Sequence, residues 1–347
     1  MRWTLLMAIA CMAVVPANAR PVSYGPNLEG FAYPYPVEFY SSRTQAQTNS
    51  MAFMDVAPTR PGPGAGRTVA LLSGTHFCAG TWASSIGALS RAGFRVLAID
   101  QLGFCKSSKP INYQYSFEQL ATNTRRLLDH QLAGRVILVG HGMGAMLAVR
   151  YALMFPRDVT QLILVDPIGL ADWKAEGALY LTIDERYALS LAISSASIRR
   201  YELANFYGGH WQPAYDPWVQ MLASLYTGSG RERYAWNQAL VSDMIFTQPV
   251  VYELGRLRVP TVLIVGTLDR AQPFAETTPR VDAARLRDVL ELARAAVKRI
   301  PDATLVTLEG VGHVPQLEVP GRFNAVLLQA IEHPATASPP SRSAYRP

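Results

Sequence analysis

Two residues that can work as an acid–base pair stand a few positions after short, largely apolar runs. Asp269 follows the run at 261–266, and His313 follows the run at 303–308. A carboxylate beside an imidazole orients the ring and lets it take a proton from a hydroxyl group or from water. The pattern therefore predicts general-base chemistry. Asp166, which ends another apolar run, is the alternative for the acid.

A glycine-rich pentapeptide is the third chemical feature. Residues 140–144 read Gly-His-Gly-Met-Gly and stand between an apolar run at 135–140 and a helical pattern at 144–155. Glycines at the outer positions suit a sharp strand-to-helix turn, because they permit close approach of the backbone and of the helix to its strand. The middle position of such a turn presents its side chain to a pocket, but Gly142 has none. The pentapeptide is not a dinucleotide-binding motif, because it lacks the later glycine spacing and the downstream acid of such a site.

Short runs that are apolar throughout must hold these residues in place. Such strands, separated by helices, are typical of a parallel sheet covered on both faces. The predicted strands lie at 68–73, 95–100, 135–140, 161–166, 261–266 and 303–308. Residues 37–57 predict two antiparallel strands with a polar turn between them. The predicted helices lie at 82–92, 116–132 with Ser116 as its N-cap, 144–155, 282–299 and 322–331.

The alternation of strands and helices stops between 168 and 250. This stretch predicts only helices and is dense in aromatic residues, so we interpret it as an insertion between the two parts of an α/β core, 37–167 and 251–332. Residues 20–36 contain four prolines (Pro21, Pro26, Pro34 and Pro36) and predict an extended arm. Residues 333–347 are rich in Pro, Ser and Ala and predict a tail without regular structure.

The order of these parts resembles the α/β-hydrolase family over roughly residues 37–332. The pentapeptide is similar to the family's G-x-S-x-G nucleophile elbow. LLSGTHF at 71–77 is similar to its oxyanion loop, and AIDQLGFCKSS at 98–108 to its D-x-x-G-x-G-x-S stretch. GTLDR and GVGHVPQLE match the places of its acid and its histidine. The resemblance implies a mostly parallel eight-stranded sheet with a helical cap at 168–250.

The resemblance also assigns roles to residues. It implies three catalytic positions: Gly142 at the nucleophile position, Asp269 as the acid and His313 as the base. It implies an oxyanion hole made by backbone N–H groups of Met143, Thr75 and His76. The implied lineage function is hydrolysis of a small hydrophobic ester or related acyl compound. Under the cap we expect a pocket lined by His141, Trp211 and Trp218.

The chain departs from the family pattern at the position that matters most. Gly142 stands where the family has serine; Ser73 and Phe104 are further departures, in the oxyanion loop and in the following motif. Glycine accepts the positive φ of an elbow freely, but acyl transfer loses its attacking hydroxyl. Three interpretations remain open: a pseudoenzyme that binds its ligand, a hydrolase silenced by replacement of the serine, and a hydrolase that uses a water activated by His313.

The remaining features concern compartment and partners. Residues 1–19 predict a secretory signal, with Arg2, an apolar stretch and a small-residue site at Ala17-Asn18-Ala19, so we expect a periplasmic or secreted protein. In an oxidising compartment Cys78 and Cys105 form either a disulfide or two buried thiols.

The 347 residues are 49% hydrophobic and 17% charged, which excludes a disordered chain. The net charge of +6 comes from scattered arginines, so we expect no nucleic-acid partner. We expect no membrane span, metal or cofactor either.

Overall fold

The computed structural model describes residues 24–271, 273–274, 277–279 and 288–332. The predicted signal peptide at 1–19 and the predicted tail at 333–347 lie outside these residues. In the part of the predicted arm that is described, residues 24–36, the chain forms turns and bends without a helix or strand.

Eight strands form a single sheet in the order β1-β2-β4-β3-β5-β6-β7-β8. The pairs β1–β2 and β2–β4 are antiparallel, and all later neighbours are parallel. This confirms the predicted mostly parallel eight-stranded sheet. The strands are β1 Glu38–Thr44, β2 Gln47–Val56, β3 Thr68–Leu72, β4 Arg95–Ile99, β5 Val136–His141, β6 Val159–Val165, β7 Thr261–Gly266 and β8 Ala303–Leu308.

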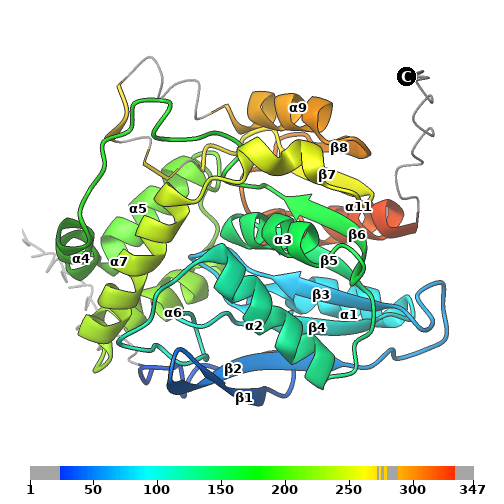
Figure 1. Cartoon of the computed structure of the whole chain (residues 1–347), viewed down its shortest axis with the longest axis horizontal. Helices are drawn as coiled ribbons and strands as arrows, with labels where there is room; N and C mark the ends of the chain where they lie inside the picture. The colour runs from blue at the N-terminus through cyan, green and yellow to red at the C-terminus, as the bar shows by residue number, and fades with distance from the viewer. Residues whose placement is uncertain (1–23, 272, 275–276, 280–287, 333–347) are drawn as a thin grey trace, which may run out of the picture.

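Helices cover both faces of this sheet because successive strand side chains point to opposite sides. Val69 and Leu71 of β3 belong to a core cluster with residues of α1 (Ala83–Arg91) and α11 (Pro320–Glu332). Ala70 and Leu72 face the other cluster, formed with α2 (Phe117–His130), α3 (Met143–Met154) and α9 (Val289–Arg299). Figure 1 shows these layers. Ser116 caps α2 as predicted, since its side chain accepts the N–H of Gln119. Residues 282–287 of the predicted helix before α9 lie outside the described residues.

A helical cap stands between β6 and β7. Its helices are α4 Ile183–Leu191, α5 Ser195–Asn205, α6 Asp216–Thr227 and α7 Arg231–Thr247, and 168–250 contains no strand. Thr182 and Ser194 start α4 and α5 with capping boxes. Figure 1 places the cap beside the end of the sheet where the parallel strands finish. Shorter helical turns complete the fold: η1 Ala79–Trp82, η2 Pro213–Tyr215, η3 Val251–Arg256 and α10 Pro315–Glu318.

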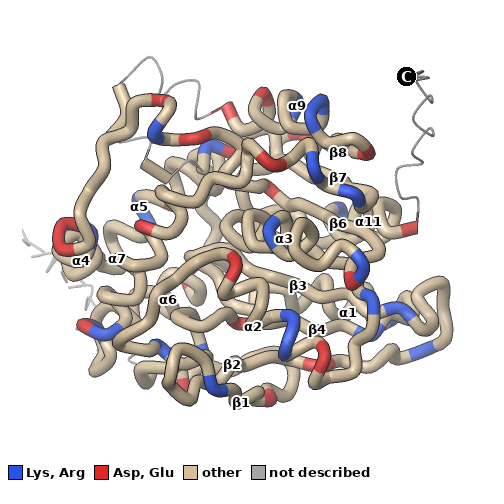
Figure 2. The backbone as a smooth tube through the Cα atoms, viewed as in Figure 1, with Lys and Arg blue, Asp and Glu red and all other residues tan. Residues whose placement is uncertain are grey.

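Charged residues of both signs are spread along the chain. Figure 2 shows Lys and Arg interspersed with Asp and Glu on most of the helices and connecting loops. Among the helices of the described ranges, none combines the length and the apolar character needed to cross a bilayer.

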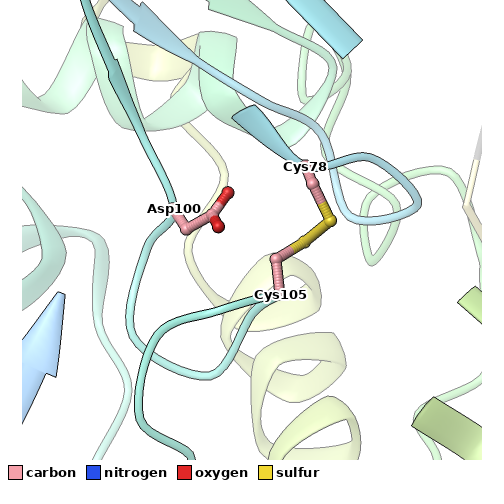
Figure 3. A group of neighbouring side chains, drawn as sticks. All are labelled: Cys78, Asp100 and Cys105. Atoms are coloured by element: carbon pink, nitrogen blue, oxygen red, sulfur yellow. A yellow bond between two sulfur atoms is a disulfide. The ribbon is translucent and has the colours of Figure 1, made fainter. Parts of the chain in front are cut away.

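A disulfide joins the loops that follow β3 and β4. Cys78 and Cys105 are bonded, with their Cα atoms 5.7 Å apart (Figure 3). Asp100, which directly follows β4, is buried and helps to fix both loops. Its carboxylate accepts the backbone N–H of Ala79 at 2.8 Å and the hydroxyl of Tyr33 at 2.6 Å. The same carboxylate therefore fixes the N-terminal segment against the loop that leads to the site.

Candidate active site

The turn at Gly142 has the geometry of a strand-to-helix elbow. β5 ends at His141, α3 begins at Met143, and Gly142 between them has φ +56° and ψ −118°. The N–H of Gly142 donates to the carbonyl of Val165 at 3.1 Å, so the end of β6 fixes the bend. A positive φ is strained for residues with a side chain, whereas glycine adopts it freely.

The two outer glycines are required by close backbone contacts. A Cβ atom at Gly140 would lie 2.2 Å from the carbonyl oxygen of Gly144. A Cβ atom at Gly144 would lie 2.5 Å from the carbonyl oxygen of Leu72, at the end of β3. Real Cβ contacts are longer than this, so any side chain here would push α3 away from the sheet. The outer glycines thus keep the start of α3 against β3 and β5.

The predicted acid and base lie next to each other behind this elbow. Nδ1 of His313 is 3.0 Å from Oδ2 of Asp269, and both side chains are buried. Oδ1 of Asp269 accepts the N–H of Ala271 at 2.8 Å. A neutral ring that donates Nδ1–H to Asp269 carries its lone pair on Nε2. A Cβ atom at Gly142 would lie 3.3 Å from that Nε2, so the base faces the centre of the elbow.

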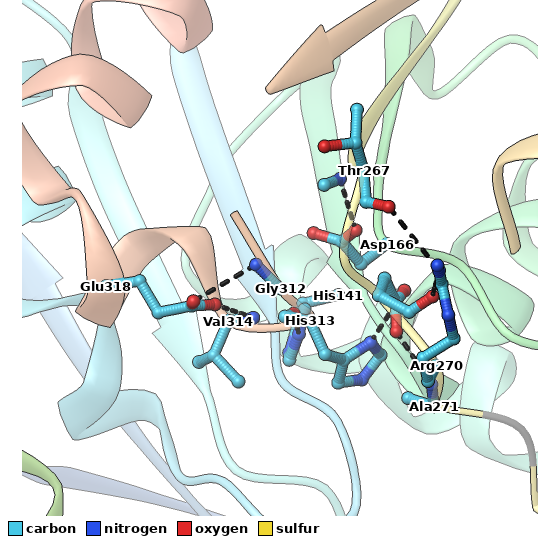
Figure 4. A network of polar contacts seen from close by, with 11 residues as sticks. His141, Asp166, Thr267, Arg270, Ala271, Gly312, His313, Val314 and Glu318 are labelled. Carbon is cyan, nitrogen blue, oxygen red and sulfur yellow. Dashed lines mark hydrogen bonds and ion pairs between the residues drawn. The ribbon is translucent and has the colours of Figure 1, made fainter. Parts of the chain in front are cut away.

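Hydrogen bonds to Glu318 and to the cap hold the loop that carries His313; Figure 4 shows those to Glu318. The carboxyl oxygens of Glu318 each accept one backbone N–H at 3.0 Å, from Gly312 and from Val314. Burial raises the pKa of Glu318, and these two N–H groups oppose that rise. The N–H of His313 itself donates to the carbonyl of Phe206 in the cap at 2.7 Å. The base is therefore fixed by its own loop and by the cap.

His141 does not line the pocket, which corrects the prediction. Its side chain supports the loop that carries His313. Its side chain is fully buried, and its Nε2–H donates to the carbonyl oxygen of His313 at 2.8 Å. Burial lowers the pKa of His141 well below its usual value, and the nearby His313 lowers it further. The ring is therefore neutral, and it acts as a fixed hydrogen-bond donor to the loop of the base.

A cavity of about 110 Å³ opens in front of Gly142 and His313. Its walls include apolar side chains from core and cap, namely Phe77, Met143, Ile168, Phe206 and Ile245. The described residues that line it include no Asp, Glu, Lys or Arg. The cavity therefore suits a small uncharged group.

The residues predicted for the oxyanion hole all line this cavity. Met143 is the first residue of α3, so its N–H has no acceptor within the helix and lies at the positive end of the helix dipole. Thr75 and His76 come from the loop after β3. The imidazole of His76 contacts the cap, with its Nδ1 3.0 Å from a carboxyl oxygen of Glu202. An oxyanion bound here would be stabilised by backbone N–H groups.

A family model described as the alpha/beta hydrolase family matches residues 63–326. The chain belongs to the α/β-hydrolase family. A crystal structure of a probable hydrolytic enzyme from Pseudomonas aeruginosa PAO1 is similar at 50% identity, with a TM-score of 0.87, over 90% of this chain and 99% of that one.

Two further relatives of this α/β-hydrolase bear on its lineage. Lipase 1 from Psychrobacter immobilis is 27% identical over 239 residues, which span 65% of each chain. The esterase EaEST from Exiguobacterium antarcticum shares 20% identity at a TM-score of 0.62, with 82% of this chain and 96% of that one covered, and this likeness concerns the fold alone. The chain is an α/β-hydrolase of the esterase and lipase lineage.

Two predicted pocket residues of this α/β-hydrolase lie elsewhere. Trp211 packs edge-on against Tyr207 and Tyr215, and Trp218 packs on Phe31 at 5.8 Å between ring centroids. Neither is among the residues that line the cavity. The prediction was wrong because aromatic density marks the cap but does not show which rings its own core uses.

Ile168, Tyr201, Phe206 and Ile245 are the residues of the cap that line the cavity instead. The Phe206 ring lies 4.6 Å from the imidazole of His313, measured between centroids. Phe206 and Tyr201 belong to the aromatic group noted in the sequence, but nothing in the pattern singled them out. Ile245 gave no signal, since α7 buries residues around most of its circumference.

Two other side chains near the site that could act as nucleophiles are engaged in different contacts. Ser73 accepts the indole N–H of Trp82 at 3.1 Å, and Cys78 is in the disulfide. Asp166, the alternative acid, is buried beside Asp269, while the imidazole of His313 donates its hydrogen bond to Asp269.

Proposed function

We propose that this chain binds a small hydrophobic ester, or a related acyl compound, in an esterase-type pocket and forms no acyl-enzyme. One observation carries the proposal. The imidazole of His313, oriented by Asp269, faces the elbow at the position where a serine would stand, and that residue is Gly142.

With a serine at this elbow, all the groups needed for covalent catalysis would be present. Its Cβ would lie 3.3 Å from Nε2 of His313, which leaves Oγ within reach of a hydrogen bond. The base would take the hydroxyl proton as oxygen attacks the substrate carbonyl, and the N–H of Met143 would stabilise the oxyanion. The leaving alcohol would receive the proton back. With glycine the first step has no attacking atom, and loss of the nucleophile alone costs roughly a million-fold in turnover in a comparable triad.

The shape of the cavity supports a short acyl group. Its volume is about 110 Å³, and Phe77, Phe206 and Ile245 contribute apolar walls. An ion placed there would lose its hydration without a charged partner among the described lining residues, which disfavours charged substrates. Lipase 1 from Psychrobacter immobilis, to which the chain is 27% identical, is named as a lipase, in keeping with this proposal.

A second candidate function is hydrolysis through water. The observation that favours it is again the direction of His313, whose Nε2 faces the space that a serine side chain would occupy. A water bound in that space can give its proton to the imidazole while its oxygen attacks the carbonyl. This route forms no covalent intermediate with the protein.

A panel of aryl and alkyl esters with acyl chains of increasing length tests both candidates. We expect hydrolysis by Gly142→Ser and none by the unchanged chain or by Gly142→Ala, which adds Cβ without a hydroxyl. Activity of the unchanged chain that disappears with His313→Ala would instead establish the water route. If Gly142→Ser folds, binds esters and is inactive, the covalent machinery is not intact and the lineage assignment of these roles is wrong.

We also propose that the chain is exported. The sequence of residues 1–19 supports this, and so does the disulfide between Cys78 and Cys105, since disulfides persist in oxidising compartments. Expression of the full chain in a Gram-negative host, followed by fractionation and intact-mass measurement, should give a periplasmic product that begins at Arg20. A full-length product in the cytoplasm would contradict the proposal.

A further inference from the structure

We infer that Asp166 is a neutral carboxylic acid that donates a hydrogen bond to Asp269, which makes it a positioning residue for the Asp269–His313 pair. The inference deepens the proposed function and rests on it only for the catalytic consequence. Its structural part concerns two buried carboxyl groups and can be tested without any turnover.

The backbone directs Asp166 toward the site. Asp166 directly follows β6 and has φ +42°, a left-handed conformation that is uncommon outside glycine. Its own N–H donates to the carbonyl of Ile264 at 2.8 Å, and its Oδ1 accepts the N–H of Gly266 at 2.8 Å. Strained backbone of this kind persists where the surrounding structure enforces it. Here β7 holds Asp166 through both bonds, one to its backbone N–H and one to its carboxyl group.

The second oxygen of Asp166 lacks a donor. One carboxyl oxygen of Asp166, one of Asp269 and one ring nitrogen of His313 lie within 4.8 Å of one another. All three side chains are buried. Asp269 already accepts from the His313 ring and from the N–H of Ala271. No group among the described residues donates to Oδ2 of Asp166. A buried ionised oxygen without a donor is costly, whereas a protonated Oδ2 becomes a donor itself and has the acceptor Asp269 beside it.

The electrostatics agree with a single shared charge. Burial raises the pKa of Asp166 well above its usual value, and the negative charge of Asp269 raises it further. Glu318 acts in the same direction, and the N–H of Gly266 acts against it. The other titratable group of the cluster, His313, is bonded to Asp269. Two carboxylates this close in the interior cannot both ionise easily, so one keeps its proton.

Three donors then hold Asp269: the N–H of Ala271, the ring N–H of His313 and the hydroxyl of Asp166. This fixes the rotation of the acid and leaves one negative charge on the pair of carboxyl groups. It also explains why two acids follow neighbouring strands at one site. Asp269 carries the charge that orients the imidazole, and Asp166 keeps Asp269 in place.

The proton on Asp166 makes a prediction about stability. A carboxyl group whose pKa is raised on folding binds a proton that the unfolded chain has released, so stability falls as pH rises from the unfolded pKa toward the folded one. Asp166→Asn is always neutral and offers both an acceptor for Gly266 and an N–H donor for Asp269. Asp166→Ala removes both groups.

Infrared difference spectroscopy tests the proton directly. At neutral pH the unchanged chain should show the carbonyl-stretch band of a protonated, buried carboxyl group, and Asp166→Asn should lack it. As a matched control, Asp158→Asn should leave that band in place, because Asp158 is paired with Arg125 at 2.8 Å near the surface. Absence of the band from the unchanged chain, or its survival in Asp166→Asn, would overturn the inference. This outcome does not depend on activity, so it is separable from a failure of the proposed function.

Unfolding as a function of pH provides a second readout. The stability of Asp166→Asn relative to the unchanged chain should increase from pH 4 to pH 8, and a flat or decreasing difference would refute the neutral carboxyl group. In the Gly142→Ser background, Asp166→Asn should keep the pH profile of kcat/KM, and Asp166→Ala should shift it and lower kcat by roughly 10- to 100-fold, the scale of a misplaced catalytic group. An unshifted profile in Asp166→Ala would refute the positioning role. If Asp166→Asn does not fold, absence of the band from the unchanged chain would still refute the neutral carboxyl group.

Discussion

Adding a side chain at the elbow should destabilise the protein by an amount that can be worked out from the structure. Gly142 has φ +56°, and the new Cβ would lie 3.3 Å from Nε2 of His313 and 3.5 Å from Cα of Gly74. The backbone conformation alone costs a residue with a side chain on the order of 1–3 kcal/mol. The contact with His313 is tight but involves the edge of a side chain, so it adds little. We expect Gly142→Ala and Gly142→Ser to lose similar amounts, about 1–3 kcal/mol each.

Denaturant unfolding at one pH, monitored by fluorescence and by circular dichroism, measures this loss. Gly134→Ala is the matched control for backbone strain, because Gly134 has φ +62° and open space around a new Cβ. It should lose about 1–2 kcal/mol. Gly321→Ala is the control without strain, since Gly321 lies in α11 with open space and no positive φ, and it should be neutral or stabilising. If Gly142→Ala proves as stable as the unchanged chain while Gly134→Ala is destabilised, the left-handed elbow at residue 142 is wrong.

Three further predictions concern the support of the site. Cys78→Ala combined with Cys105→Ala opens a link across 27 residues and should cost about 3.5 kcal/mol by loop entropy, measured by denaturant unfolding; an unchanged midpoint would argue against the disulfide. Glu318→Ala leaves two backbone N–H groups beside His313 without their acceptor and should cost about 1–3 kcal/mol, with a loss of activity in the Gly142→Ser background. Full retention of both would show that this carboxylate does not hold the loop. Because the pKa of His141 is lowered on folding, the unfolded chain takes up a proton that the folded chain refuses, so stability should fall as pH drops below about 6.5. Unfolding curves of His141→Gln should lack that component, and an identical pH dependence in this variant would contradict a buried neutral ring.

Much of the fold follows from local pattern. The predicted strands at 261–266 and 303–308 have the observed bounds of β7 and β8, because each is a short run rich in β-branched and other apolar residues with turn-forming residues on both sides. The roles of Gly140 and Gly144 were also predictable, because a sharp strand-to-helix turn needs residues without a side chain at these positions. In the structure their backbone contacts leave no room for a Cβ atom. The pairing of Asp269 with His313 followed from the resemblance to the α/β-hydrolase family, whose acid and histidine stand at these places in the chain.

Side-chain direction was harder to predict. The sequence marks Trp211 and Trp218 as large and apolar, but the same property suits packing away from the cavity. Trp211 packs within the cap, and Trp218 packs on Phe31 of the N-terminal segment. His141 directly precedes Gly142, and the sequence does not show which way its ring points. In the structure the ring points to the carbonyl of His313 and not into the cavity. Asp166 and Asp269 looked like alternatives for one role. Neighbouring parallel strands β6 and β7 bring both to the site, where one proton can distinguish them.

The most direct test of the central claim is labelling with a fluorophosphonate probe, followed by intact-mass measurement and peptide mapping. The unchanged chain should remain unmodified, since Gly142 offers no hydroxyl to the base. Gly142→Ser should gain one adduct at position 142, and Gly142→Ala should gain none. A stable adduct on the unchanged chain would reveal another nucleophile, and a folded Gly142→Ser that resists the probe would show that His313 and Asp269 do not form a working base.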